Sequence, residues 1–409
     1  MSDTTKPAAL ELVWEAIHAT PEEFGGALLD PEAGQAALFY PGKVVRSGFL
    51  AWQKNKVEAP ATCEVAAFEG NRDLWSVELG ASQDLSAVRG DEAHLALRVT
   101  PLRLAPDVLF AWVSAGRHAG QLVCIDRAAH RVRWTAPAFE ASTTHVSPDA
   151  TRSLVASPEG PVRLLDASGA QVAELGRGAS ESPEAALGDA GGVLLDEGTI
   201  RGFDRDGRPT WTLDMVGAEA AMGAARVLVH GDACFVAEPG ALKRVALADG
   251  VTVWRADGIR GHELVVSGHG PLVAVHDPTA GVTRVHRAAT GAPIENEALE
   301  TVLHVAHAGE DLVASTEQGV VRVDAAGRLR WRFHAEDLLP GPLCVVGRDV
   351  LALALDEEEV PFLLRLDAQS GTERGRARSP LGGAPRLETV GRDLVSLSNP
   401  LAVFLYRLR

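Results

Sequence analysis

The sequence predicts an all-β fold: a closed β-propeller built of four-stranded antiparallel blades. Three observations predict it. One unit recurs about every 40 residues, each copy contains four short apolar runs separated by turn signals, and the copies continue to the C-terminal end of the chain. A lone sheet of this size leaves an apolar face exposed, so neighbouring copies must stack, and all-β units of this period close into a ring. We expect about eight blades, within a range of seven to nine.

The clearest copy spans residues 303–333 and reads LHVAHAGEDLVASTEQGVVRVDAAGRLRWRF. Its third run ends in an Asp that is followed three residues later by Gly. This spacing of Asp and Gly is typical of the turn of a β-hairpin, because Gly adopts positive φ and Asp accepts hydrogen bonds from nearby backbone amides. The position of this Asp, which we call the anchor, recurs at Asp126, Asp166, Asp204, Ala246, His286, Asp324 and Asp367. Seven units therefore have a regular register.

The two ends of the chain are expected to close the ring together. The last copy, residues 385–409, stops after three strands, so its fourth strand must come from the N-terminal part. Either LELVWEAI, which contains Trp14, or DLWSVEL, which contains Trp75, could supply it. The spacing of apolar residues in LELVWEAI fits a helix as well as a strand.

The chain is expected to form one domain. We assign residues 1–60 to an N-terminal segment that could supply the closing strand and residues 61–409 to the propeller repeats, with an insertion around residues 80–98.

Charge and composition exclude several function classes. The net charge of −16 repels nucleic acid and anionic lipid, so we expect neither a nucleic acid nor a membrane partner. No apolar run has the length of a membrane span, and no export signal opens the sequence. The four cysteines stand far apart without a CxxC pair. They are typical of buried free thiols in a reducing compartment, and we expect a cytoplasmic protein.

The repeat resembles that of the quinoprotein-type (PQQ-like) propellers. Several copies follow the pattern Asp-x-x-(x)-Gly-x-x-x-Trp, and the resemblance covers most of residues 61–409. The tryptophans that match the fourth-strand position are Trp75, Trp134, Trp211, Trp254 and Trp331. The resemblance implies that each indole wedges between adjacent blades. It implies no single function, because this repeat serves dehydrogenases, outer-membrane assembly lipoproteins and protein-binding scaffolds.

The residues that accompany a quinone in enzymes of this family are not evident here. The resemblance implies that those enzymes carry an adjacent cysteine pair beside the quinone, and Glu, Asn and Asp around a calcium ion. This chain has no adjacent cysteines. No GxxxxGK[ST], HExxH or GxSxG stretch occurs either. We therefore expect no cofactor. Similar intracellular propellers accompany MoxR-type ATPases and von Willebrand A proteins in bacteria, and this resemblance suggests a partner class.

Histidines are the candidate metal ligands. His145, His262 and His304 lie in comparable parts of three blades and could face the central channel together. A metal site needs three or four converging ligands, however, and the sequence favours ordinary turn and core roles for them.

A second candidate is the acidic run Asp356, Glu357, Glu358 and Glu359, which lies at a turn between two strands. The run could dock a basic partner, although a solvated loop that keeps a strand edge from pairing is the favoured interpretation.

These observations predict a non-catalytic cytoplasmic propeller that acts as a platform for protein–protein interaction. The alternative is an enzyme, or a propeller that binds a small ligand or metal at the mouth of its channel.

Overall fold

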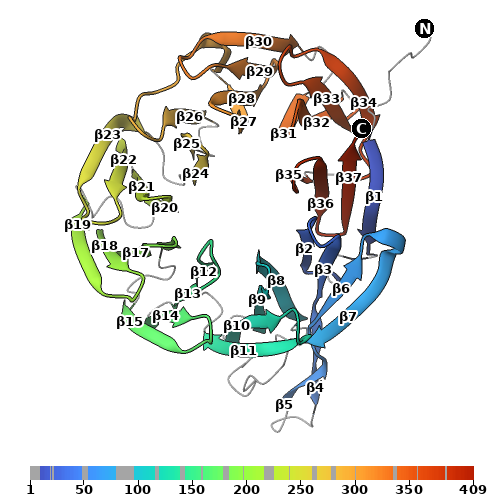
Figure 1. Ribbon diagram of the computed structural model, residues 1–409, viewed down its shortest axis with the longest axis vertical. Helices are drawn as coiled ribbons and strands as arrows, with labels where there is room; N and C mark the ends of the chain where they lie inside the picture. The colour runs from blue at the N-terminus through green and yellow to red at the C-terminus, as the bar shows by residue number, and fades with distance from the viewer. Residues whose placement is uncertain are drawn as a thin grey trace.

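The computed structural model shows a ring of nine blades around a central axis (Figure 1). The structure describes residues 10–18, 20, 23–47, 54–79, 96–115, 119–138, 143–157, 160–177, 184–196, 198–215, 225–238, 240–259, 265–277, 282–299, 301–334, 339–356, 358–382 and 385–409. In each blade the strands run antiparallel from an inner strand near the axis to an outer strand on the perimeter. The blade count lies within the predicted range and is one higher than the preferred eight.

The first three blades use the following strands. Blade 1 contains β2 (Gly26–Asp30), β3 (Gln35–Tyr40), β6 (Thr62–Ala67) and β7 (Arg72–Glu78), with a 3-10 turn, η3 (Glu69–Asn71), before β7. Blade 2 contains β8 (Ala96–Leu104), β9 (Val108–Ala115), β10 (Ala119–Asp126) and β11 (Arg131–Ala138). Blade 3 contains β12 (Thr143–Val146), β13 (Arg152–Ala156), β14 (Pro161–Asp166) and β15 (Gln171–Arg177).

The middle blades follow in chain order. Blade 4 contains β16 (Glu184–Leu187), β17 (Gly191–Asp196), β18 (Thr199–Asp204) and β19 (Pro209–Asp214). Blade 5 contains β20 (Arg226–His230), β21 (Ala233–Glu238), β22 (Gly240–Ala246) and β23 (Thr252–Ile259). Blade 6 has three strands, β24 (Val265–His269), β25 (Leu272–Asp277) and β26 (Val282–Arg287), followed by a 3-10 turn, η5 (Glu297–Leu299).

The last three blades return to the start of the chain. Blade 7 contains β27 (Val302–Ala308), β28 (Asp311–Thr316), β29 (Gly319–Val323) and β30 (Leu329–His334). Blade 8 contains β31 (Leu339–Val346), β32 (Asp349–Leu355), β33 (Pro361–Asp367) and β34 (Glu373–Arg378). Blade 9 contains β35 (Arg386–Thr389), β36 (Leu394–Asn399) and β37 (Ala402–Leu408), and its outer strand is β1 (Leu10–Ile17).

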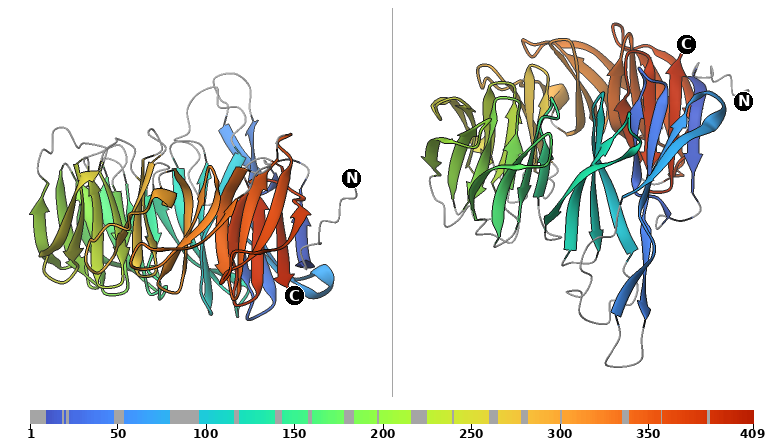
Figure 2. Two further views of the ribbon diagram at one scale, coloured as in Figure 1. Left: turned by 90° about the horizontal axis from the view of Figure 1, so that it is seen from above. Right: turned by 60° about the horizontal axis from the view of Figure 1, so that its bottom comes forward.

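The extra blade is blade 1, whose repeat is interrupted. A hairpin of β4 (Gly42–Ser47) and β5 (Lys54–Ala59) is inserted between β3 and β6, and the start of β4 pairs with β8 of the next blade. Figure 2 shows this hairpin extending beyond the ring. Because the insertion breaks the 40-residue period, the first two strands of blade 1 look unrelated to the repeat.

The ring closes through the first of the two predicted strands. β1 pairs antiparallel with β37, from Leu10 opposite Leu408 to Ile17 opposite Ala402. Trp14 is 3% exposed, and its Nε1 donates to Oδ1 of Asn71 at 2.8 Å, so the closing strand is also anchored to blade 1. LELVWEAI is therefore a strand, and DLWSVEL forms the outer strand of blade 1.

Tryptophans join neighbouring blades as the resemblance implies. The indole Nε1 donates to a backbone carbonyl of the following blade, at 3.0 Å from Trp134 to Ala167, 2.7 Å from Trp211 to Leu247, 3.0 Å from Trp254 to Ala288 and 2.9 Å from Trp331 to Ala368. A glycine with positive φ in that blade's turn lies against each ring, and a Cβ there would come within 2.6–2.7 Å of it: Gly169, Gly250, Gly291 and Gly371. The Gly and the Trp of successive repeats are thus one packing unit.

The core of the protein lies between neighbouring blades, where the facing surfaces of two adjacent sheets pack together as apolar clusters. Among the described residues, no helix is long and apolar enough to cross a membrane.

Candidate functional site

Blade 6 departs from the repeat because its described sheet has no fourth strand. The outermost strand of this blade is β26, whereas the blades on either side carry the outer strands β23 and β30 (Figure 1). The outer wall of the ring is therefore interrupted between blades 5 and 7.

The register explains where the fourth strand is lost. Arg287 lies opposite Leu272, as Ala246 lies opposite Ala233 in blade 5, and its N–H donates to the carbonyl of Ala292 just as that of Ala246 donates to Val251. The anchor of blade 6 is therefore Arg287, one residue beyond the predicted His286. Glu295 then follows the anchor at the same interval as Trp254 does in blade 5. An exposed acidic residue occupies the position of the blade-joining tryptophan.

Asn296 directs the chain away from β26. Its side-chain Oδ1 accepts from the N–H of Ala298 at 2.9 Å, which starts η5, because Asn readily caps such turns. Its Nδ2 donates to the carbonyl of Gly327 in blade 7 at 2.8 Å. Ala298 is buried against blade 7 in the same apolar cluster as Leu312. The segment that would form the outer strand is thus fixed to the next blade.

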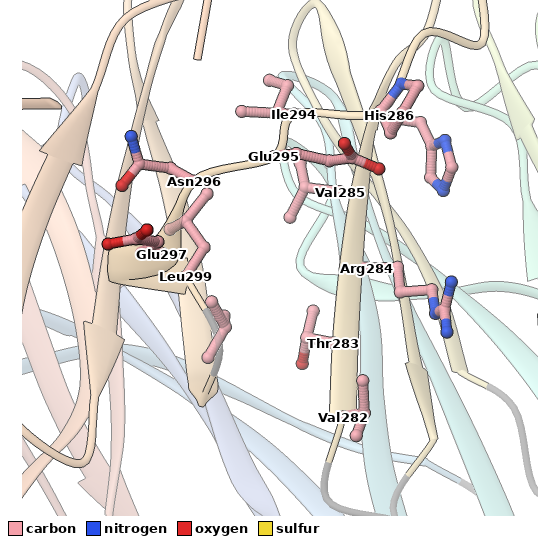
Figure 3. A pocket seen from close by; sticks show the side chains of 12 residues that line it. Val282, Thr283, Arg284, Val285, His286, Ile294, Glu295, Asn296, Glu297 and Leu299 are labelled. Carbon is pink, nitrogen blue, oxygen red and sulfur yellow. The ribbon is translucent and has the colours of Figure 1, made fainter. Parts of the chain in front are cut away.

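A cavity of about 460 Å³ lies between β26 and this diverging segment (Figure 3). Its apolar walls include Val285, Ile294 and Val302, which are 5%, 6% and 1% exposed and belong to the core between blades 6 and 7. Val282, at the start of β26, is 39% exposed. Val282 is therefore the apolar side chain that stands exposed beside this strand edge.

Backbone groups along β26 face this cavity. The carbonyl of Val285 accepts from the N–H of Ile294 at 2.9 Å, so Val285 points its backbone groups outward, away from β25. In an antiparallel ladder outward groups recur at every second residue, which makes Thr283 outward as well. Within the described chain, the N–H of Val285 and both backbone groups of Thr283 have no backbone partner. At the corresponding places in blade 5, Leu242 and Arg244 pair with Ala256 and Trp254 of β23.

Charged side chains of both signs, Arg284, Glu295 and Glu297, line the cavity. Glu295 and Glu297 on the diverging segment are exposed, and in Figure 3 the side chains of Glu297 and Arg284 both point away from the cavity. His286 is 5% exposed and its Nδ1 bonds to the carbonyl of Gly291 at 3.1 Å. Burial lowers the pKa of His286, so the imidazole is neutral at pH 7 and does not offset the two glutamates.

Two of the three predicted histidines, His145 and His304, lie on different blades. His145 is on β12 in blade 3, where burial lowers its pKa, and His304 is on β27 in blade 7, where desolvation and the neighbouring His276 lower its pKa. His262 lies outside the described residues. In the part of the chain that the structure describes, no group of three or more His, Cys, Asp or Glu could hold a metal ion.

The acidic turn between β32 and β33 has a local structural role. Oδ1 of Asp356 accepts from the backbone N–H of Glu358 at 3.0 Å and of Val360 at 2.7 Å, and so orders the turn. Glu358 and Glu359 are exposed, and Glu357 lies outside the described residues. Docking of a basic partner at this turn stays a prediction.

The open edge was missed at the level of sequence, although it leaves a signal there. The run Glu295–Asn296–Glu297 replaces the alternation of apolar and polar residues that a fourth strand needs. With the anchor placed at His286, the interval between Ala246 and Trp254 leads to Ile294 instead of Glu295, and this concealed the substitution.

The fold and the repeat together define a β-propeller of the PQQ-like class. A family model described as "Outer membrane protein assembly factor BamB" matches residues 46–292, more than half of the chain. The chain belongs to this family. It matches no curated protein.

Three solved structures are similar to this chain at low sequence identity. The computationally designed Ika8 protein is 13% identical with a TM-score of 0.51, over 76% of this chain and 96% of that one. BamB from Moraxella catarrhalis is 16% identical with a TM-score of 0.46, over 75% and 96%. The C-terminal WD40 domain of Sif2 is 10% identical with a TM-score of 0.46, over 76% and 95%.

Proposed function

We propose that this protein is a non-catalytic cytoplasmic platform that binds another protein through its rim and outer wall. The observation that carries the proposal is the open edge of blade 6 with its cavity. An uncovered strand edge beside apolar surface is a template for association, and folded proteins normally cover such edges. The description of the family model, an assembly factor, supports a role among other proteins.

The cysteines support a reducing compartment. Cys63, Cys124, Cys234 and Cys344 are all buried and unpaired. Burial raises the pKa of each thiol to about 12, which leaves them protonated and unreactive. Fractionation of the native cell should recover the protein with cytoplasmic markers, and recovery with the envelope would contradict this part of the proposal. An ATPase of the MoxR type or a von Willebrand A protein is the partner class to test first.

The platform is tested by recovering its partner from the native cell with the tagged full chain. Charge reversal by Glu295→Lys with Glu297→Lys should remove the partner. The matched control is Glu310→Lys with Glu317→Lys, which makes the same charge change at exposed turns of blade 7. A chain that stays without a partner, or a partner retained equally by both variants, would contradict the proposal. Metal or quinone in the purified protein, seen by elemental analysis or absorbance, would favour the enzyme alternative.

A further inference from the structure

We infer that the β4–β5 hairpin is a basic arm that binds an acidic, extended segment of a partner protein. The inference goes beyond the proposed function, because it assigns a second contact surface that shares no residue with blade 6. It starts from the distribution of lysine. Three of the five lysines in the chain belong to this hairpin, Lys43, Lys54 and Lys56.

The hairpin differs in charge from the rest of the protein. Residues 43–58 contain four basic residues and one acidic residue, which leaves 35 of the 39 basic and 54 of the 55 acidic residues for the remainder of the chain. The acidic residue lies at the base of the arm, where Nζ of Lys43 and Oε2 of Glu58 form an exposed ion pair at 2.5 Å. Residues 44–57 contain three basic residues and no acidic one. Beyond its base the arm therefore carries charge of one sign.

The pairing of the two strands does not offset this charge. Each of the three basic residues stands opposite a neutral one, in the pairs Arg46–Asn55, Lys54–Ser47 and Lys56–Val45. Cross-strand pairs of opposite charge stabilise a sheet. A hairpin selected for its own stability would therefore place Asp or Glu at some of these neutral positions.

The outer strand β34 shows how the ring accommodates a strand with as many basic residues. Arg374 of this strand forms ion pairs with Asp349 and Asp367, and Arg376 forms one with Glu373. Carboxylates of blade 8 thus offset the charge of β34. The arm beyond its base contains no residue that would do the same.

The fold does not require the arm. β3 and β6 pair with each other along their whole length, so blade 1 has four strands without β4 and β5. In the described part of the chain, the pairing of β4 with β8 is limited to Gly42 and Lys43, and Figure 2 shows the rest of the hairpin extending beyond the ring. A two-stranded hairpin adds little stability by itself, and connecting segments that project from a rigid scaffold often carry its binding residues.

An acidic protein segment fits the arm better than other anions do. β5 is the last strand of its sheet among the described residues, so an extended segment can lie along its edge. Lysine is a compact charge on a flexible stem, which suits the carboxylates of a segment without fixed structure. Nucleic acids and anionic membranes present larger surfaces, which the acidic remainder of the protein repels over about 10 Å. A short acidic segment contacts the arm alone.

A fluorescently labelled deca-glutamate peptide tests the inference with the full-length protein. Fluorescence anisotropy in about 50 mM salt should show saturable binding, and a Gly-Ser peptide of equal length should not bind. Raising the salt to about 300 mM should weaken binding at least about fivefold, because salt screens exposed charges. Absence of binding at the lower salt concentration would overturn the inference.

Charge reversal on β5 locates the binding site. Lys54→Glu with Lys56→Glu should weaken the binding of deca-glutamate at least about tenfold, because it places like charges against each other. The matched control is Arg131→Glu with Arg133→Glu, which makes the same charge change at exposed positions of β11, the strand at the other end of the same sheet. Equal weakening by both pairs would mean that the peptide responds to net charge only, and the arm would then not be its site.

Excision of the arm provides a second variant. Replacement of residues 43–59 by Gly-Asn-Gly keeps the ladder between β3 and β6 intact. This variant should unfold at nearly the same temperature as the full chain and should not bind deca-glutamate. Binding retained by the correctly folded variant would contradict the assignment to the arm.

Recovery of the native partner separates this inference from the proposed function. If the partner is lost with the reversals of Glu295 and Glu297 but retained after excision of the arm, the platform stands and the arm is not a contact. If excision removes the partner and the reversals do not, the arm is supported and the open edge of blade 6 is not the contact.

Three further measurements test the identity of the occupant. Tighter binding of the arm to oligothymidylate of about ten nucleotides, or to vesicles with about 30% phosphatidylserine, than to deca-glutamate would overturn the assignment to a protein segment. A concentration-dependent dimer that disappears on excision of the arm would make the occupant a second copy of this acidic chain, and would overturn the assignment to a partner protein.

Discussion

Blades 6 and 9 each contain three strands contributed in sequence, and among the described residues only blade 9 gains a fourth strand from the chain. Blade 9 receives β1 from the opposite end of the sequence, which covers the edge of β37 along its length. In blade 6 no described strand covers the edge of β26, because Asn296 fixes the following segment to blade 7. The comparison teaches that a strand from a distant part of the sequence already completes one blade of this ring. Blade 6 likewise needs an added outer strand to become a four-stranded sheet.

The first way to break the comparison is to remove the strand that closes blade 9. Deletion of residues 1–17 uncovers β37 and removes Trp14, whose loss alone should cost about 3–5 kcal/mol of unfolding free energy. We expect the largest fall in melting temperature of any change considered, measured by calorimetry. A peptide of residues 10–17 added in trans should restore part of it. A deletion variant as stable as the full chain would show that the ring does not depend on this strand.

The second test compares the residues at the tryptophan position of blades 6 and 7. Trp331 is 8% exposed and bonds to Ala368 of blade 8, so Trp331→Ala should cost about 3–5 kcal/mol in urea unfolding. Glu295→Ala removes an exposed side chain and should change stability by less than about 0.5 kcal/mol. Similar costs for the two variants would mean that Glu295 holds blade 6 to blade 7 as the tryptophans hold the other blades.

The third test concerns the glycine that packs against the tryptophan of the preceding blade. Gly371 has φ of 72° and a Cβ there would approach the ring of Trp331 to 2.6 Å, whereas Gly309 has φ of 67° with nothing within 4 Å. Gly309→Ala should cost about 1–2 kcal/mol for the backbone conformation alone. Gly371→Ala should cost about 2–4 kcal/mol, because the clash adds to it. Equal effects in urea unfolding would show that the contact with the indole does not contribute.

The regular blades could be predicted from sequence, and the irregular ones could not. Turn residues such as Asp367 and Gly371 repeat because each blade needs the same hairpin, so their spacing reports the fold directly. Blade 1 was miscounted because the β4–β5 hairpin interrupts its period. The candidate site was missed for a different reason. Its signal is the run Glu295–Asn296–Glu297, which lacks the alternation of a strand, and this signal was hidden because the repeat was aligned on His286 instead of Arg287.

The last comparison is between the anchors of blades 8 and 6, where Asp367 and Arg287 stand at equivalent positions. The carboxylate of Asp367 accepts backbone hydrogen bonds from Ser370 and Gln369 and pairs with Arg374, which together lower its pKa to about 2. A pKa lowered in the folded state contributes stability above the ordinary value of 3.8, and this contribution is lost as the pH falls toward 2.

Asp367→Asn should therefore reduce stability at pH 5 and differ progressively less from the unsubstituted protein as the pH approaches 2. Urea unfolding of both proteins across this range measures the difference. We expect a smaller effect than that of any core substitution above, because the pair is partly exposed to solvent. If the two proteins differed in unfolding free energy by the same amount at pH 5 and at pH 2, the charge of the Asp367 carboxylate would not contribute to stability. Arg287 in blade 6 has no carboxylate to titrate, so Arg287→Asn should leave the acid dependence unchanged.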